Sequence, residues 1–337
     1  MAPPKTPGHH SITVTDVARL AGVSAMTVSR VINQPDKVPA ATVARVRAAI
    51  DEAGYVPNRA AGGLRSSRSR LVAAVVPTLT GSIFLQTIES LTAHLAARGY
   101  QLMVGQSGYG QDREDALISD IIGRRPDGIV LTGVLHTPLA RRRLAAAGVP
   151  VIETWDLTPQ PIDIAIGFSH EDVGAQVCRF LHDRGRTRLA VVGGDDPRAQ
   201  RRARAFADAA VALGLKAPLM QSVPAPATLA DGRLVAGELL AREKKIDGIF
   251  CSSDLFAMGV ILQARTLGIA VPGRLSVVGF GDLAFAADLE PALTTVRVDG
   301  TRIGQLAADC IIDRELHEAH HGKTVDVGFQ VMERGSA

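Results

Sequence analysis

Residues Thr15–Asn33 read Thr-Asp-Val-Ala-Arg-Leu-Ala-Gly-Val-Ser-Ala-Met-Thr-Val-Ser-Arg-Val-Ile-Asn. Thr15 can cap a first helix, Gly22 can end it, and Ser24 can cap a second. Apolar residues on the two segments are expected to meet across the turn: Val17, Leu20, Ala21, Val23, Val28 and Val31. Two short helices joined by a tight turn that contains glycine predict a helix-turn-helix, whose second helix lies in a DNA major groove.

A third helix is expected over residues 40–53. Val43, Val46 and Ile50 recur at helical spacing, and Gly54 can end the helix. Residues 12–56 are therefore expected to form a small helical domain. A disordered extension is expected before it, over residues 1–11.

The positive charge of the chain is concentrated near its start. The whole 337-residue chain has a formal net charge of +3, but residues 1–70 contain ten Lys or Arg against four acids, so the remainder is net negative. This asymmetry indicates a polyanionic partner for the N-terminal part, most simply nucleic acid. A basic solvated face without a partner is the alternative, and the helix-turn-helix pattern argues against it.

The second helix supplies the side chains that we expect to meet DNA. Its outward positions near the start are Ala25, Met26, Ser29 and Arg30. Arg30 can donate to both acceptors of a guanine edge, whereas Met26 offers only apolar contact, for example to a thymine methyl. Thr27, Ser29 and Asn33 suit phosphate contacts, which position a helix without reading the sequence.

The stretch quoted above, together with Gly-Tyr-Val-Pro-Asn-Arg-Ala at 54–60, strongly resembles the lactose/galactose repressor (LacI) family. The resemblance extends over essentially the whole chain from about residue 12. It implies a homodimeric regulator that binds double-stranded operator DNA and a small-molecule effector. The residues that we expect at the DNA are Thr15, Ser24, Ala25, Met26, Thr27, Ser29, Arg30, Asn33, Tyr55, Asn58, Arg59 and Leu64.

Residues 57–70 are expected to form a hinge helix and a linker. Pro57 can begin a helix, but Gly62 and Gly63 each disfavour it by about 1 kcal/mol relative to alanine. A plain spacer is the alternative interpretation. The resemblance implies that this segment folds only when two subunits meet on the operator, with Leu64 wedged into the minor groove.

From residue 71 onwards, short β-branched runs alternate with helical stretches. Strands are expected at 71–76, 101–104, 128–131, 150–153 and 162–166, and again at 189–192, 219–223, 248–251, 275–279 and 293–297. The motif Asp-Gly-Ile at 127–129 recurs at 247–249. This pattern predicts a duplicated βαβ architecture, in which two parallel-sheet lobes enclose a cleft.

The resemblance implies a periplasmic-binding-protein-like body with three crossovers between its lobes. The first lobe is expected at about 71–168 and 299–324, and the second at about 169–298 and 325–337. The predicted fold class is thus α/β: an N-terminal helix-turn-helix headpiece followed by a two-lobed parallel-sheet effector and dimerisation domain, residues 71–337.

Ligands of such sheets lie beyond the carboxyl ends of the strands, so residues that follow strands are the candidates for effector binding. They are Ser82, Phe84, Tyr109, His136, Glu153, Trp155, Phe168, Ser169, His170, Arg198, Asp254 and Asp282. Arg198 can bind a carboxylate through two parallel hydrogen bonds, and His136 and His170 would add donors. Trp155, the sole tryptophan, is expected either to stack on a ligand ring or to pack between the lobes.

Several segments resemble the gluconate-repressor branch of the family: Pro77–Thr80, Gly108–Gly110, Leu135–Pro138 and Asp163–Phe168. Two departures concern the cleft. Relatives with neutral ligands tend to carry an acid directly after the Gly-aromatic pair, where this chain has Gly281, and Ser169-His170 replaces a frequent Asp-Asn. Fewer acids beside the cleft favour an anionic effector such as gluconate.

Other function classes find little support in the sequence. It contains no phosphate-binding G-x-x-x-x-G-K-[ST], no G-x-S-x-G and no H-E-x-x-H, so neither an enzyme nor a bound metal or cofactor is expected. The histidines at 317, 320 and 321 are interpreted as residues of a solvated helix end. With no signal-like or membrane-spanning run and three widely separated cysteines, a cytoplasmic protein is expected.

The sequence therefore predicts a transcriptional repressor of sugar-acid (gluconate-type) catabolic genes that an effector releases from its operator. Within the family, a neutral sugar or a purine, acting as inducer or co-repressor, is the alternative effector. Outside the family, the alternative is a sugar-binding protein or an enzyme with an incidental basic N-terminus.

Overall fold

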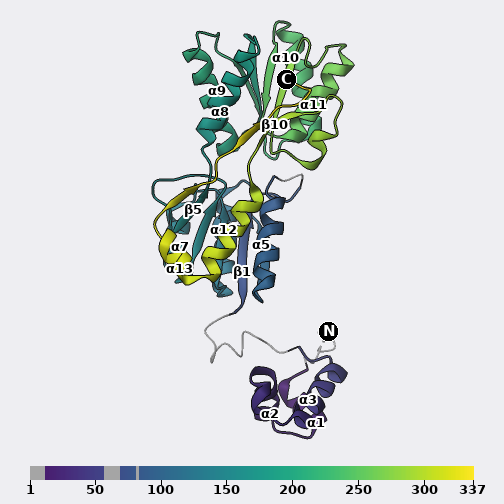
Figure 1. Cartoon of the computed structure of the whole chain (residues 1–337), viewed down its shortest axis with the longest axis vertical. Coiled ribbons are helices and arrows are strands. Elements are labelled where there is room, and N and C mark those ends of the chain that lie inside the picture. Colours follow the sequence, from purple (N-terminus) through teal and green to yellow (C-terminus); the bar gives the residue numbers. More distant parts are fainter. Residues whose placement is uncertain (1–11, 57–68, 81–82) are drawn as a thin grey trace, which may run out of the picture. The chain divides into compact units, whose positions relative to one another are not determined.

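The computed structural model describes residues 12–56, 69–80 and 83–337. The chain divides into two compact units, one ending at Ser69 and the other starting at Arg70 (Figure 1). The expected N-terminal extension, most of the hinge and Ser82 lie outside the described residues.

The first unit contains α1 (Val14–Ala21), α2 (Ala25–Asn33), the 3-10 turn η1 (Pro35–Lys37) and α3 (Ala40–Ala53). The predicted helix-turn-helix is confirmed, but Thr15 does not cap α1. Thr13 does so: its hydroxyl accepts from the Asp16 amide at 3.4 Å, and its own amide donates to Asp16 Oδ2 at 3.0 Å. This reciprocal capping box needs an acid three residues after the cap, which Thr13 has and Thr15 lacks.

The three helices share a small apolar core. Val17, Val28 and Val46 are fully buried, one from each helix. The expectation that Leu20 joins them is wrong, because Leu20 is 48% exposed and Ala18 is buried in its place. Gly22 ends α1 at a φ of 62°, a left-handed conformation that glycine adopts without steric cost.

The second unit is built on two parallel-type sheets, each of six strands within the described residues. The first has the spatial order β11-β5-β4-β3-β1-β2. Its strands are β1 (Leu71–Val76), β2 (Gln101–Gln106), β3 (Gly128–Thr132), β4 (Val151–Thr154), β5 (Ile164–Gly167) and β11 (Thr324–Asp326). The helices of this lobe are α5 (Leu85–Ala97), α6 (Gln111–Gly123), α7 (Pro138–Ala145), α12 (Gly300–Ile312) and α13 (Arg314–His320).

The second sheet repeats this arrangement in the order β12-β10-β9-β8-β6-β7. Its strands are β6 (Leu189–Gly194), β7 (Leu219–Val223), β8 (Gly248–Cys251), β9 (Ser276–Phe280), β10 (Thr294–Arg297) and β12 (Gln330–Met332), of which β12 is antiparallel to β10. The helices are α8 (His170–Asp183), α9 (Pro197–Ala212), α10 (Leu229–Arg242), α11 (Asp254–Thr266) and the 3-10 turn η2 (Ala284–Ala287).

Burial on both faces explains the continuous apolar runs of the strands. Along β1, Val72 and Ala74 pack in the cluster that includes α5 and α12, whereas Ala73 and Val75 pack in the cluster that includes α6 and α7. Because successive side chains point to opposite faces, a strand covered on both sides has no polar face. In Figure 1, α5 and α12 run side by side along one face of β1.

The chain crosses between the lobes three times, after β5, β10 and β11. The last crossover lies between Asp326 and Gln330, slightly later than the residue 324/325 boundary expected from the sequence. The C-terminal residues close the second lobe, where Ser336 O accepts from the Val277 amide at 2.8 Å. In the described residues, no helix has the length and apolar character needed to cross a membrane.

Candidate functional site

Some of the side chains expected to contact DNA lie on the exposed face of α2. Met26 is 62% exposed, and Ser29 and Arg30 are also exposed. Ala25 is half-buried and packs against the helical core, so it is less exposed than its neighbours Met26 and Arg30. Met26 and Arg30 lie one turn apart, as two side chains reading neighbouring base pairs would.

The other expected DNA contacts have local roles. The Ser24 hydroxyl caps α2 by accepting from the Thr27 amide at 3.1 Å, and Asn33 Nδ2 donates to the Ser29 carbonyl at 2.8 Å. Thr15 is exposed, and Tyr55 is half-buried against the core. Asn58, Arg59 and Leu64 lie outside the described residues.

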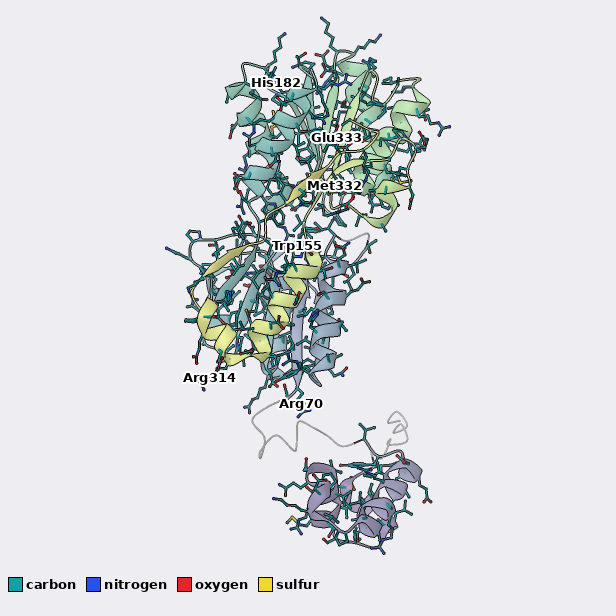
Figure 2. The ribbon with its side chains drawn as sticks, viewed as in Figure 1. Arg70, Trp155, His182, Arg314, Met332 and Glu333 are labelled. Carbon is teal, nitrogen blue, oxygen red and sulfur yellow. The ribbon has the colours of Figure 1, made fainter. Side chains whose placement is uncertain are left out.

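A cavity of about 90 Å³ lies between the lobes of the second unit, at the carboxyl ends of both sheets, and opens to solvent. The expected residues that line it are Phe84, Tyr109, Trp155 and Arg198. The second lobe contributes further residues that the sequence reasoning missed: Asp196, Arg202, Ser252, Ser253 and the segment 225–227. Figure 2 shows Trp155 at the boundary between the lobes.

One wall of the cavity is aromatic. The Phe84 and Trp155 rings meet edge to face with centroids 5.2 Å apart, and Phe168 meets Trp155 from within the core at 6.0 Å. Trp155 Nε1 donates to Thr87 Oγ1 at 2.9 Å, so the indole is fixed before any ligand binds. Trp155 has a φ of 65°, a left-handed conformation that is costly for a bulky residue and typical of functional sites.

Two arginines of α9 approach the cavity. Arg198 Nη1 donates across the lobe boundary to the Thr132 carbonyl at 3.3 Å, and its guanidinium lies 5.3 Å from the Phe84 ring centroid. Arg202, only 5% exposed, stacks on Phe280 with its guanidinium 3.9 Å from the ring centroid. Burial lowers the pKa of Arg202 to about 10, which leaves it cationic at neutral pH.

Arg202 retains an unused donor. Its Nη1 donates to His170 Nδ1 at 3.0 Å and its Nη2 to the Ser252 carbonyl at 3.3 Å. Its buried Nε has no hydrogen-bond partner among the described residues. A buried unpaired donor is costly, so the guanidinium is held at the cavity by its stacking on Phe280 and by its two other hydrogen bonds.

The two histidines expected to donate to the effector do not line the cavity. His170 is buried, its Nδ1 accepts from Arg202, and its Nε2 therefore donates to the Trp155 carbonyl at 3.1 Å. Burial, with the charges of Arg202, Arg198 and Arg201, holds the pKa of His170 well below its usual value. His136 is enclosed between Glu114 Oε1 and the Gly133 carbonyl, each at 3.1 Å. Both expectations are corrected, because all four ring nitrogens bind protein groups and neither residue lines the cavity.

Five more expected effector residues have structural roles instead. Glu153 accepts from the Ile162 amide at 2.6 Å, and burial raises its pKa. Ser169 caps α8 by accepting from the Asp172 amide at 3.0 Å, and Phe168 is fully buried. Asp254 accepts from the Leu283 amide at 2.7 Å, and Asp282 binds two arginines, Arg297 and Arg334. These five residues lie at or just after the ends of strands, as predicted, but their side chains do not line the cavity.

A partly buried ion pair also joins the lobes. Arg201 of α9 donates from Nη1 to both carboxylate oxygens of Asp156, at 2.8 Å each, and its Nε donates to Glu171 at 2.7 Å. Asp156 is fully buried just after β4, and burial raises its pKa despite the arginine. The charge of Arg201 therefore fastens α9 of the second lobe to the first.

The sequence signal for Arg202 is its spacing from Arg198 along a predicted helix. Arg198 and Arg202 are four residues apart on a helix that follows β6, so they share the face that meets the cleft. Arg202 is not among the residues that directly follow a strand, because it lies one helical turn beyond Arg198 within α9.

At the opposite end of the first sheet, two of the three histidines that follow α12 bind an acidic side chain. His317 and His321 both contact the carboxylate of Asp163, which is 8% exposed. The expected solvated helix end is confirmed for His321, whose side chain is 67% exposed, but both rings also bind Asp163, which the sequence did not predict.

Each of the two units matches a known protein family. Residues 13–58 match the model of the bacterial regulatory proteins of the lacI family, and residues 178–337 match that of a periplasmic binding protein-like domain. The chain is 34% identical over 326 residues to the HTH-type transcriptional regulator GntR of Pseudomonas aeruginosa, covering 96% of this chain and 95% of the relative.

Two further matches span the chain equally well. The HTH-type transcriptional regulator IdnR of Escherichia coli is 30% identical over 325 residues, which cover 96% of this chain and 98% of the relative. The crystal structure of a LacI family transcriptional regulator from Silicibacter pomeroyi superposes with a TM-score of 0.89 at 31% identity, covering 96% of this chain and 99% of that one.

Proposed function

The chain belongs to the LacI family of bacterial transcriptional regulators, and we propose that it is a homodimeric repressor that a small sugar acid such as gluconate releases from its operator. The helix-turn-helix unit supplies the DNA-binding surface, and the cavity between the lobes takes the effector. A DNA partner of this kind implies a cytoplasmic protein.

The single observation that supports a sugar acid is the pair of cationic side chains at one cavity. Arg198 and the buried Arg202 both line it, and the Nε of Arg202 is unpaired among the described residues. A guanidinium binds a carboxylate with charge-assisted hydrogen bonds, which are about twice as strong as neutral ones. Asp196, Ser252 and Ser253 offer partners for the hydroxyl groups of a polyol chain.

The coupling to DNA is proposed to run through the arrangement of the lobes. The Arg201–Asp156 pair and the Arg198–Thr132 hydrogen bond both join the two lobes beside the cavity. An effector that contacts both lobes favours the arrangement in which these contacts form, and operator DNA favours another. Because coupling is reciprocal, bound operator weakens effector binding by the same factor, typically 5- to 150-fold.

A neutral or purine effector is the second candidate. The edge-to-face pair of Phe84 and Trp155 provides an aromatic wall on which a planar ring could stack. Such a ligand would bring no carboxylate to the two arginines, and among the described residues that line the cavity only Asp196, 3.9 Å from Arg198 Nε, carries a negative charge, which is why the sugar acid is favoured.

Calorimetric titration of the full chain tests the proposal with gluconate, 2-ketogluconate, ribose and hypoxanthine. Each ligand is added to the protein alone and to the protein saturated with a palindromic duplex that it has selected from a random pool. We expect the sugar acids to bind and ribose not to bind, with weaker sugar-acid binding on the DNA complex.

The outcomes separate the parts of the proposal. Binding of hypoxanthine or ribose without any sugar acid would overturn the effector assignment and leave the regulator intact. Equal affinity of a sugar acid for the protein and its DNA complex would overturn the release mechanism. Failure to select any duplex would overturn the repressor itself.

A further inference from the structure

Three potential metal ligands converge at the amino end of the first sheet, far from the cavity. Asp163 immediately precedes β5, while His317 lies on α13 and His321 directly follows it. One ligand atom from each of the three lies within 4.8 Å of the other two. In Figure 2, Arg314, the first residue of α13, lies at the end of the first lobe that is farther from the second lobe.

The carboxylate of Asp163 is shared by the two imidazoles. His317 Nε2 lies 2.8 Å from Oδ2, and His321 Nδ1 lies 2.7 Å from Oδ1. The Val151 amide also donates to Oδ2, at 3.0 Å, and the Asp163 carbonyl accepts from the Gly322 amide at 2.8 Å. The aspartate is therefore fixed by backbone contacts, and both ring nitrogens are aimed at it.

From this geometry we infer a binding site for one divalent transition-metal ion, of the zinc class, with Asp163, His317 and His321 as ligands. Two histidines and a carboxylate are a common ligand set for Zn²⁺, with bonds of about 2.0–2.2 Å. Bonds of this length in a tetrahedral site set the ligand atoms about 3.4 Å apart. The two contacts with Asp163 would therefore widen by about 0.6–0.7 Å as the ion replaces the shared protons, and the two ring nitrogens, now within 4.8 Å of each other, would adopt the same separation of about 3.4 Å.

The surroundings favour a cation and allow it to enter. The side chain of His321 is 67% exposed and that of His317 is 24% exposed, so water can complete the coordination shell. Burial raises the pKa of the nearby Cys310 to about 11, and the charges of Asp309, Asp163 and Asp313 add to this rise. These carboxylates add negative charge near the site, while Arg314 and Lys323 are the cations of the same segment.

The spacing of the histidines adds a second, independent reason. Positions 317 and 321 are one helical turn apart, and their rings lie 5.7 Å from each other, both on the side of Asp163. His320, between them, instead donates from Nδ1 to the Leu316 carbonyl of its own helix. His320 is therefore a matched control within the same segment.

The test is Zn²⁺ binding by the full chain after removal of metal with a chelator, measured by competition with a chromophoric chelator. All proteins carry His9→Ala and His10→Ala, so that the N-terminal histidines do not contribute. We expect one ion per chain, at least tenfold weaker binding in His317→Gln and in His321→Gln, and unchanged binding in His320→Gln. Bound Co²⁺ should give the visible absorption of a four-coordinate site, and Zn²⁺ should raise the thermal unfolding midpoint.

Three results would overturn the site. The first is no stoichiometric binding by the parent protein. The second is equal Zn²⁺ affinity in the His317→Gln, His321→Gln double variant. The third is a loss in His320→Gln as large as that in His317→Gln. Circular dichroism of each variant without metal shows that it is folded, and the Co²⁺ spectrum reports the ligands directly.

Discussion

The buried guanidinium of Arg202 donates to His170 Nδ1 at 3.0 Å. Because arginine cannot accept, this contact fixes the neutral tautomer of His170 with its proton on Nε2, directed at the Trp155 carbonyl. The histidine thus positions both the arginine at the cavity and the loop that carries the aromatic wall. His170, which was expected to contact the effector, instead positions Arg202 and Trp155.

Replacing Arg202 should weaken effector binding without abolishing DNA binding. Arg202→Met retains apolar packing on Phe280 but removes the cation. We expect effector affinity to fall 10- to 100-fold or more, equivalent to about 1.5–3 kcal/mol for a charged hydrogen bond. Calorimetry measures the affinity, and a gel shift checks that DNA binding remains. The exposed Arg204→Ala, on the same helix, is the control; an equal loss there would contradict the role of Arg202.

Breaking the pair between the lobes should weaken both stability and effector binding. Arg201→Ala leaves the fully buried Asp156 without its countercharge, at a cost of about 3 kcal/mol. Glu171→Gln removes the more exposed partner of the same arginine, and should cost less than about 1 kcal/mol. Chemical denaturation of both variants measures the difference. Equal effects would show that Asp156 is not the stabilising partner.

The contact between α8 and α9 should not tolerate a side chain at residue 174. A Cβ on Gly174 would overlap the Arg202 carbonyl oxygen, so Gly174→Ala forces the helices apart. We expect a loss of roughly 1–3 kcal/mol. Gly237→Ala, on α10, meets only the Gln263 side chain at 3.4 Å and should stabilise by up to about 1 kcal/mol. Thermal unfolding compares the two, and a stable Gly174→Ala would refute the close packing.

The headpiece should depend on Arg30 for base recognition. Arg30→Ala removes an exposed side chain of α2 that can bind a guanine edge, and is expected to weaken operator binding by roughly 1–3 kcal/mol and relax base preference. Arg47→Ala removes an exposed positive charge from α3. It should lower affinity without changing which bases are selected. A titration that Arg30→Ala leaves unchanged would mean that another helix reads the DNA.

Asp254 should give the stability a measurable dependence on pH. Burial raises its pKa to about 6 in the folded protein, above the usual 3.8, so the folded state binds more protons between these values. Stability from this group is therefore present at low pH and lost as the pH rises from about 4 to 6, by up to about 3 kcal/mol. Asp254→Asn can still accept from the Leu283 amide and donate to Thr295 Oγ1, but it does not titrate.

The measurement is the difference in unfolding free energy between Asp254→Asn and the parent at pH 4 and at pH 7. We expect the variant to gain relative to the parent on going from pH 4 to pH 7. A difference that stays constant would mean that Asp254 ionises at its ordinary pKa.

The architecture was largely predictable from local patterns. Val28 and Val31 of α2 recur at helical spacing, as do Val43 and Val46 of α3, and the runs 71–76 and 248–251 are apolar throughout because both faces of their sheets are covered. The short strands β11 and β12 were missed, since three residues carry no detectable period. The site was predicted only in part: Trp155 and Arg198 line the cavity, whereas His136 and Asp254 follow strands but turn inward.

The order of apolar, polar and turn residues along the chain determined by itself that there would be a basic three-helix unit and a duplicated α/β body, because helix and strand periods are local properties. Which side chains meet at the cavity or at Asp163 was decided only by the tertiary structure. Residues 163 and 317 are distant in the chain, and the direction of each side chain depends on hydrogen bonds to partners that only packing brings within reach.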